Sequence, residues 1–183
     1  MTEVLPANRF QEKYGTPGVR AIDKVVDHLD DYVRQFITKA PFVVMATANQ
    51  DGSCDASPKG GKPGFVKVLD ARHLLLPDVR GNNLFQSYDN IDGNSNVGLV
   101  FFIPGIDFTA RVNGTAQFVD ADDLRARGIS MEVFDPDDNA ALQQGLLIEV
   151  VEAFPHCTRA LKFSKLWDPE TIETNRKEPP VKR

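Results

Sequence analysis

The sequence predicts a mainly β protein, an antiparallel barrel or sandwich with peripheral helices, and three observations support this prediction. Six or so apolar runs of strand length recur between residues 42 and 151. Turn residues separate the runs at short intervals, as at Asn49–Gly52 and at Pro104-Gly105. Few long helical patterns lie between them, which disfavours a parallel α/β sheet.

Residues 1–40 are predicted to form a helical segment that packs on the sheet. Apolar side chains recur at helical spacing from Val19 to Ile37. Thr16-Pro17 has the hydroxyl-then-proline pattern of a helix start, and Asp30-Asp31 is a candidate break into two helices. Pro41 ends the helical region, because the residue before a proline avoids the helical conformation.

The rest of the chain divides into a main domain, residues 41–168, and a charged tail, residues 169–183, that we expect to be flexible. Asp70-Ala71-Arg72 is the expected turn of a hairpin. Helical turns are predicted around Leu84–Ile91, Asp120–Arg127 and Thr158–Trp167. The expected strands are Phe42–Ala48, Cys54–Ser57, Phe65–Leu69, His73–Leu76, Val97–Ile103, Thr109–Val119 and Leu146–Val151.

Composition excludes several classes of function. The net charge of −5 argues against a nucleic-acid partner, since nucleic-acid-binding proteins present a basic stripe. The apolar runs are too short to span a bilayer, and the amino terminus lacks the layout of a signal peptide. Cys54 and Cys157 fit neither a disulfide framework nor a zinc site, so we expect a cytoplasmic protein without a metal.

Two loops that leave strand ends are candidates for an anion pocket. Lys59 and Lys62 flank Gly60-Gly61, where lysine charge and glycine N–H groups could hold a phosphate. Arg80-Gly81-Asn82 precedes a helical segment, whose N-terminus favours anions. The alternatives are an exposed soluble turn for the first loop, and for the second a helix start capped by Asn82.

Other polar residues have simpler interpretations. Arg111 interrupts an apolar strand and is read either as a ligand contact or as a solvent-facing side chain. Trp167 is either a packing anchor or a ring contact, and His73 and His156 are assigned structural roles.

The chain contains none of the HExxH, GxSxG, CxxC and GxGxxG motifs, so an enzyme of this sequence would most easily rely on a cofactor for its chemistry. A flavin, which needs a phosphate clamp and apolar walls, suits these features.

Four ordered motifs resemble the pyridoxamine 5′-phosphate oxidase-like family of FMN-binding split barrels, in a branch other than the true pyridoxamine phosphate oxidases. They are SPKGGKPGF (Ser57–Phe65), LLLPDVRGN (Leu74–Asn82), PGIDFTARVNG (Pro104–Gly114) and HCTRALKFSKLW (His156–Trp167). The matching region runs from about Asp30 to Trp167. The true oxidases have an RxVLLK strand motif and an arginine- and histidine-rich carboxyl end, where this chain has DASPKG and RALKFSKLW.

The resemblance implies a six-stranded split β-barrel that forms a homodimer, with two FMN molecules at the interface. It places the FMN phosphate near Ser57, Lys59, Arg80 and Asn82, and the ring near Pro77 and Asp78. A partner subunit would contribute the strand around Thr109 and Arg111, and the carboxyl-terminal Arg159, Ser164 and Trp167 would reach the same interface.

The resemblance further implies an FMN-dependent oxidoreductase that acts on a small substrate other than pyridoxamine phosphate. No catalytic acid or base is identified. The alternatives are a flavin-binding sensor or carrier without turnover, and a split barrel that binds haem or a deazaflavin in the same groove.

Overall fold

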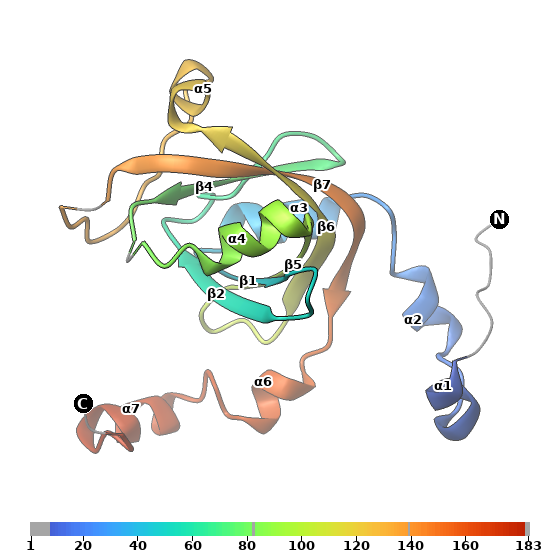
Figure 1. Cartoon of the computed structure of the whole chain (residues 1–183). Helices are drawn as coiled ribbons and strands as arrows, with labels where there is room; N and C mark the ends of the chain where they lie inside the picture. The colour runs from blue at the N-terminus through green and yellow to red at the C-terminus, as the bar shows by residue number, and fades with distance from the viewer. Residues whose placement is uncertain (1–7, 82, 139, 182–183) are drawn as a thin grey trace.

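The computed structural model describes residues 8–81, 83–138 and 140–181, and its core is one strongly curved antiparallel sheet (Figure 1). The strands are ordered β2-β1-β5-β6-β7-β4-β3. Their bounds are Phe42–Ala48 (β1), Cys54–Gly60 (β2), Lys67–Val68 (β3), His73–Val79 (β4), Asn96–Phe102 (β5), Thr109–Asp120 (β6) and Leu142–His156 (β7).

The predicted antiparallel β-fold with peripheral helices is confirmed, but the expected six-stranded split barrel takes the form, in the part of the chain that the structure describes, of a seven-stranded sheet that does not close into a barrel. The sheet has seven strands, and among the described residues its two ends, β2 and β3, do not pair with each other. The two-residue strand β3 is too short to extend the ladder across the opening. The opening is instead bridged by side chains, as described below.

Side chains that alternate between the two faces of each strand produce the core. In β1, Val43 and Met45 are buried, and in the neighbouring β5 Leu99 and Phe101 are buried on the same face. Residues Leu74 and Leu76 of β4 complete this inner face from the far side of the curved sheet.

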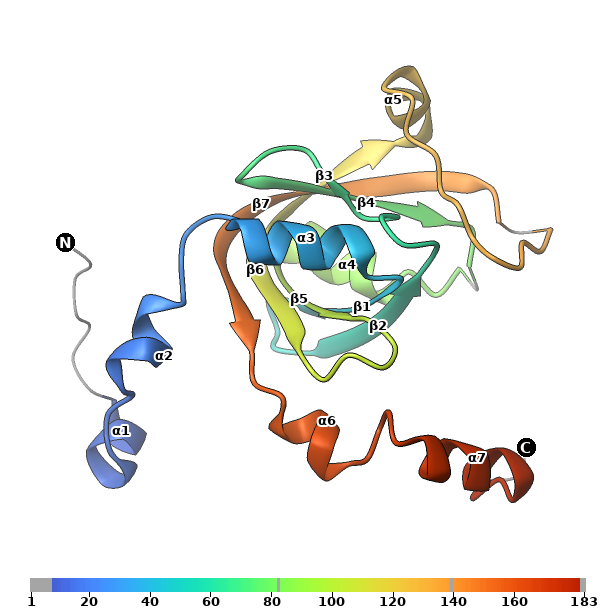
Figure 2. The same ribbon diagram turned by 180° about the vertical axis from the view of Figure 1, so that it is seen from behind.

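Helices α3 and α4 close the two ends of the space that the sheet encloses, as a comparison of Figures 1 and 2 shows. Helix α3 (Asp31–Lys39) begins at Asp30, whose side chain accepts a hydrogen bond from the Val33 N–H, and it buries Val33, Phe36 and Ile37. The predicted break at Asp30-Asp31 is therefore confirmed. Helix α4 (Gln86–Gly93) buries Ile91 and the polar Asn90, whose amide donates to the Thr47 hydroxyl at 3.0 Å.

The other helices lie outside the sheet. Helices α1 (Arg9–Tyr14) and α2 (Val19–Asp23) bury no residue and extend away from the sheet (Figure 2). The predicted start at Thr16-Pro17 is wrong, since α2 begins after Gly18. The remaining helices are α5 (Ala121–Ala126), α6 (Arg159–Phe163) and α7 (Pro169–Lys177). In the region where a flexible tail is expected, α7 forms but buries no residue. No helix among the described residues is long and apolar enough to cross a membrane.

Candidate functional site

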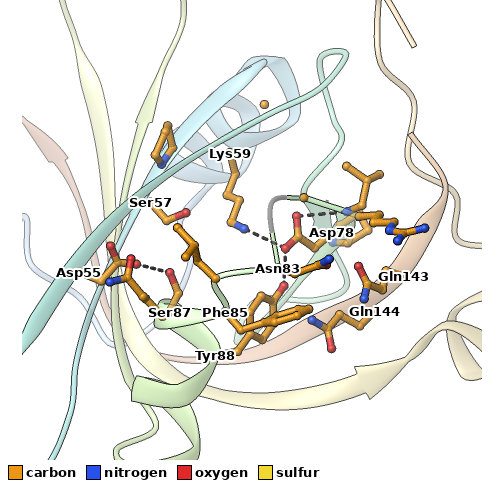
Figure 3. Close-up of a pocket in the computed structure, with 18 of the residues that line it drawn as sticks. Asp55, Ser57, Lys59, Asp78, Asn83, Phe85, Ser87, Tyr88, Gln143 and Gln144 are labelled. Carbon is orange, nitrogen blue, oxygen red and sulfur yellow. Dashed lines mark hydrogen bonds and ion pairs between the residues drawn. The ribbon is translucent and has the colours of Figure 1, made fainter. Parts of the chain in front are cut away.

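A pocket of about 390 Å³ lies where the two ends of the curved sheet approach each other (Figure 3). Strand β2 forms one wall, and the end of β4 with the loop after it forms the opposite wall. The start of α4 forms the third wall. The pocket therefore occupies the gap that backbone pairing leaves open.

The register of β2 explains why its polar side chains face this pocket. Lys59 lies opposite Val43, Ser57 opposite Met45 and Asp55 opposite Thr47, and all three partners in β1 are buried. Residues that face each other across an antiparallel pair project from the same side of the sheet. Asp55, Ser57 and Lys59 thus lie on the inner face, at its edge.

An ion pair spans the opening. Lys59 Nζ lies 2.8 Å from Asp78 Oδ2, and the two side chains are only 17% and 16% exposed. The other carboxylate oxygen of Asp78 accepts a hydrogen bond from the Val79 N–H at 3.1 Å. Because β2 and β4 are not neighbours in the sheet, this pair joins two strands that share no backbone hydrogen bond.

Tyr88 of α4 completes the polar centre of the pocket. Its hydroxyl donates to the Asp78 carboxylate, and the Lys59 ammonium lies 5.6 Å from the centre of its ring. Burial, and then the negative charge of Asp78, raise the pKa of Tyr88 far above its ordinary value, so the phenol stays protonated. Phe85 and Phe118 flank the Tyr88 ring at centroid distances of 6.0 and 5.7 Å.

The start of α4 presents uncapped backbone donors to the pocket. Its N-cap is Phe85, which has a φ of 52° and no side-chain hydrogen bond to the first turn. Asn83 also has a positive φ, of 59°. A positive φ is unfavourable for phenylalanine, whereas asparagine adopts it readily, and strained residues such as Phe85 concentrate at functional sites. Ser87 fixes the helix start to β2 by donating to the carboxylate of Asp55.

The residues of the pocket fit a phosphate group. The carboxylates of Asp55 and Asp78 already accept hydrogen bonds from their neighbours, whereas Lys59 and Arg80 bring cationic donors to the pocket. Arg80 is exposed, and among the described residues its guanidinium has no ion-pair partner. Proteins bind phosphates with cationic side chains and with backbone N–H groups at a helix start. Lys59, Arg80 and the first turn of α4 supply these groups here.

The structure brings five of the predicted site residues together in this pocket, namely Ser57, Lys59, Pro77, Asp78 and Arg80. Asn82 lies outside the described residues. Lys62 is not among the lining residues, and its ammonium lies 3.6 Å from the carboxylate of Glu132 at the surface. Asp55 and Tyr88 were missed, although the alternation of polar and small residues in CDASPKG signals that Asp55 shares a face with Ser57 and Lys59.

Five other predicted residues lie elsewhere in the same chain: Thr109, Arg111, Arg159, Ser164 and Trp167. The first two are on β6, and the guanidinium of Arg111 lies 5.8 Å from the Phe154 ring. The indole N–H of Trp167 donates to the Ile106 carbonyl at 3.1 Å, and the guanidinium of Arg159 lies over the Phe163 ring. The Ser164 hydroxyl donates to the Leu161 carbonyl. Their contact with a cofactor bound by a partner subunit stays a prediction.

Comparison with known proteins identifies the family. The sequence model described as "Pyridoxamine 5'-phosphate oxidase" matches residues 29–151. A variant of HupZ from Group A Streptococcus is 16% identical to this chain, and the match covers 70% of this chain and 99% of that chain. The TM-score is 0.51, so the two proteins share a fold, and the likeness shows no more than that. A candidate pyridoxamine 5′-phosphate oxidase from Lactobacillus delbrueckii is 22% identical, with coverage of 70% and 95% and a TM-score of 0.49. No curated protein sequence matches the chain significantly.

Proposed function

The chain belongs to the pyridoxamine 5′-phosphate oxidase family, and we propose that it is an FMN-binding flavoprotein, an oxidoreductase that acts on a small substrate. The observation that supports this proposal best is the pocket itself. It gathers Ser57, Lys59 and Arg80 beside the uncapped start of α4, in the gap between the two ends of the sheet. On this proposal, the open sheet is the split barrel of the FMN-binding class.

Lys59 and Arg80 would hold the FMN phosphate from opposite walls of the pocket. Lys59 is bound to Asp78 in this structure, so a phosphate must share or replace that carboxylate. Phe85 and Tyr88 supply an aromatic wall, and the protonated Tyr88 hydroxyl holds Asp78 in place by its hydrogen bond. Bound FMN would supply hydride or electron transfer, so the protein itself needs to provide only position and electrostatics.

The substrate on this proposal is not pyridoxamine phosphate. Strand β2 reads CDASPKG, where the true oxidases have a basic RxVLLK motif. The single ammonium group of Lys59 is balanced by Asp55 on the same strand and by Asp78 on the opposite wall. Strand β2 therefore offers no excess of positive charge for the phosphate of a second ligand.

One observation favours a second candidate function, a flavin-binding sensor or carrier without turnover. The ionisable side chains of the inner pocket bind one another: Asp55 accepts from Ser87, and Asp78 accepts from Lys59 and Tyr88. A general acid or base must instead be within hydrogen-bond reach of the substrate. The pocket would then hold a flavin but contribute no proton transfer.

We further propose that two copies of the chain form a homodimer through the outer face of β2, β1, β5 and β6. Small residues line this face, because Ala46 lies between Ala56 and Gly98 in the sheet. They border a largely apolar hollow of about 610 Å³, and Phe42 is 38% exposed at the same face. Light scattering coupled to size-exclusion chromatography tests this proposal, and a monomeric mass in the presence of FMN would contradict it.

A cytoplasmic location belongs to the same proposal. Cys54 and Cys157 are both exposed free thiols, which persist in a reducing compartment.

The decisive experiment identifies the chromophore and then tests for turnover. The purified protein is examined by absorbance, where a flavin band near about 450 nm is expected, and spectra of a deazaflavin or a haem would instead identify those groups. The FMN-loaded protein is then mixed with NADH, NADPH and a panel of small oxidants. Turnover above that of free FMN supports the oxidoreductase, whereas bound FMN without turnover supports the sensor or carrier. A protein that neither contains a flavin nor binds added FMN contradicts both.

A further inference from the structure

A second cluster of basic side chains surrounds Phe154, away from the pocket. The Phe154 ring lies 5.3 Å from Lys24 Nζ, 5.8 Å from the Arg111 guanidinium carbon and 6.0 Å from the His156 ring centre. Strand register explains part of this arrangement, because Arg111 lies opposite Phe154 and Thr109 opposite His156. These four residues therefore share the outer face of the β6–β7 pair, and Lys24 reaches it from the segment after α2.

The two permanent cations of this cluster lack acidic partners in the described part of the chain. Lys24 Nζ donates to the Pro155 carbonyl at 3.0 Å, and the Arg111 guanidinium lies over the face of Phe154. The nearest acid along the same face of β7 is Glu152, whose carboxylate accepts a hydrogen bond from the Asn113 amide. Both side chains are partly buried, so a charge without a counter-ion is more costly there than at the surface.

A buried hydroxyl beside the cluster is also without a partner. Thr109 is 4% exposed, and its Oγ1 has no hydrogen-bond partner among the described residues. It lies opposite His156, so the two side chains are neighbours on the outer face. Buried polar atoms are nearly always hydrogen-bonded, so an orphan of this kind indicates a missing partner.

The pKa of His156 depends on the two cations. Partial burial, and then the positive charges of Arg111 and Lys24, lower the pKa of His156 below its ordinary value of 6.5. The same imidazole would gain a proton more readily if an anion neutralised those charges. Its titration therefore reports on the occupancy of the cluster.

We propose that Lys24, Arg111, His156 and Thr109 form an anion site on the outer face of β6 and β7, which binds the carboxylate or phosphate group of a small molecule. Arginine and lysine provide the charge, and the threonine hydroxyl provides the buried hydrogen bond. In the proposed function, Thr109 and Arg111 reach the FMN of a partner subunit. The further step, that the anionic group belongs to the substrate, rests on that proposed function. The binding of an anion does not depend on that assignment.

The test follows the His156 ring protons by NMR while sodium sulfate or sodium acetate is added at constant ionic strength, with sodium chloride as the reference. The chain has three histidines, and a His156→Gln variant assigns the signal. We expect a saturable shift of the His156 signal and a rise in its pKa with one or both anions. Lys24→Gln and Arg111→Gln should each weaken binding by about tenfold, as expected for the loss of a charge-assisted hydrogen bond. Thr109→Val should weaken binding by a few-fold, and Lys39→Gln on α3 is the matched control that should leave it unchanged.

The two oxyanions distinguish the chemistry: sulfate alone indicates a phosphate-like group, and acetate alone indicates a carboxylate. The proposal is overturned if neither anion moves the His156 signal beyond the chloride reference, or if the Lys24 variant binds as tightly as the unmodified protein. Lys24 lies outside the core, so this variant keeps the test valid if Arg111→Gln does not fold. The measurement needs neither FMN nor turnover, so failure of the flavin proposal and failure of the anion site are separate results.

Discussion

Replacing Lys59 by methionine removes one of the two cations that the pocket offers to a flavin phosphate. Its ammonium group is largely buried and is already 2.8 Å from Asp78. At an effective dielectric constant of about 20, two unit charges about 4 Å apart attract each other by about 4 kcal/mol. Asp78 competes for the same ammonium group, so we assign about half of this, ~2 kcal/mol, to the phosphate, which corresponds to about 30-fold weaker FMN binding.

Fluorescence titrations with FMN and with riboflavin provide the assay, because riboflavin has the same ring but no phosphate. Lys59→Met should weaken FMN binding and leave riboflavin binding nearly unchanged. Lys62→Met is the matched control, since Lys62 is about half exposed and is 3.6 Å from Glu132 outside the pocket. Lys59→Arg should restore most of the affinity for FMN, because it retains the charge.

The Lys59 variant also leaves Asp78 with hydrogen bonds but no cation. For a pair this buried, we expect unfolding to require about 1–3 kcal/mol less free energy, between the values for exposed and fully buried pairs. Circular dichroism during urea unfolding establishes that the variant is folded before it is titrated. Unchanged FMN affinity in the folded variant, or an equal loss for FMN and riboflavin, would refute the assignment of Lys59 to the phosphate.

Three further predictions concern stability, and urea unfolding checks each of them. Tyr88→Phe should lower the free energy of unfolding by about 1–2 kcal/mol, because it removes a largely buried donor to Asp78. Gly114→Ala should lower it by about 2–4 kcal/mol, since a Cβ there would lie 2.1 Å from the Glu149 carbonyl oxygen in the neighbouring strand. The lowered pKa of His156 means that the unfolded chain takes up its proton first as the pH falls. Stability is then lost as the pH falls through the ordinary value of 6.5, and His156→Gln should reduce this loss.

Each of these predictions has a contradicting result. Full stability of the Tyr88 variant would mean that Asp78 needs no third partner, and full stability of the Gly114 variant would mean that β6 and β7 separate at little cost at this bulge. An identical pH dependence with and without His156 would mean that its pKa is not lowered in the folded protein. Gly81→Ala is a control for the glycine result, because a Cβ there would meet nothing within 4 Å.

The local features of the fold could be predicted from the sequence. The range Phe42–Ala48 is a strand with the predicted bounds, and Asp30 caps α3 where the break was expected. Strand ends were less predictable. Strand β2 continues through Pro58 to Gly60, because an edge strand tolerates the missing N–H of a proline. Strand β7 is longer than the apolar run Leu146–Val151, because its polar ends still pair with β6.

The candidate site was only partly predictable, because its key contacts join residues that are distant in the sequence. Lys59 and Arg80 could be selected from charge and neighbouring glycines, since both features are local. The pairing of Lys59 with Asp78 depends on the curvature of the whole sheet, and no local pattern signals it. Likewise, Lys24 approaches Arg111 only because the segment after α2 forms a bridge from Val26 to β7.

A crystal structure of the protein with bound FMN tests the central claim most directly. We predict that the FMN phosphate lies between β2 and the start of α4, with oxygen atoms within hydrogen-bond distance, roughly 2.7–3.2 Å, of Lys59 and Arg80. The Lys59–Asp78 contact should lengthen as the phosphate takes its place or shares it. A phosphate bound elsewhere on the chain, with the Lys59–Asp78 pair unchanged, would contradict the account.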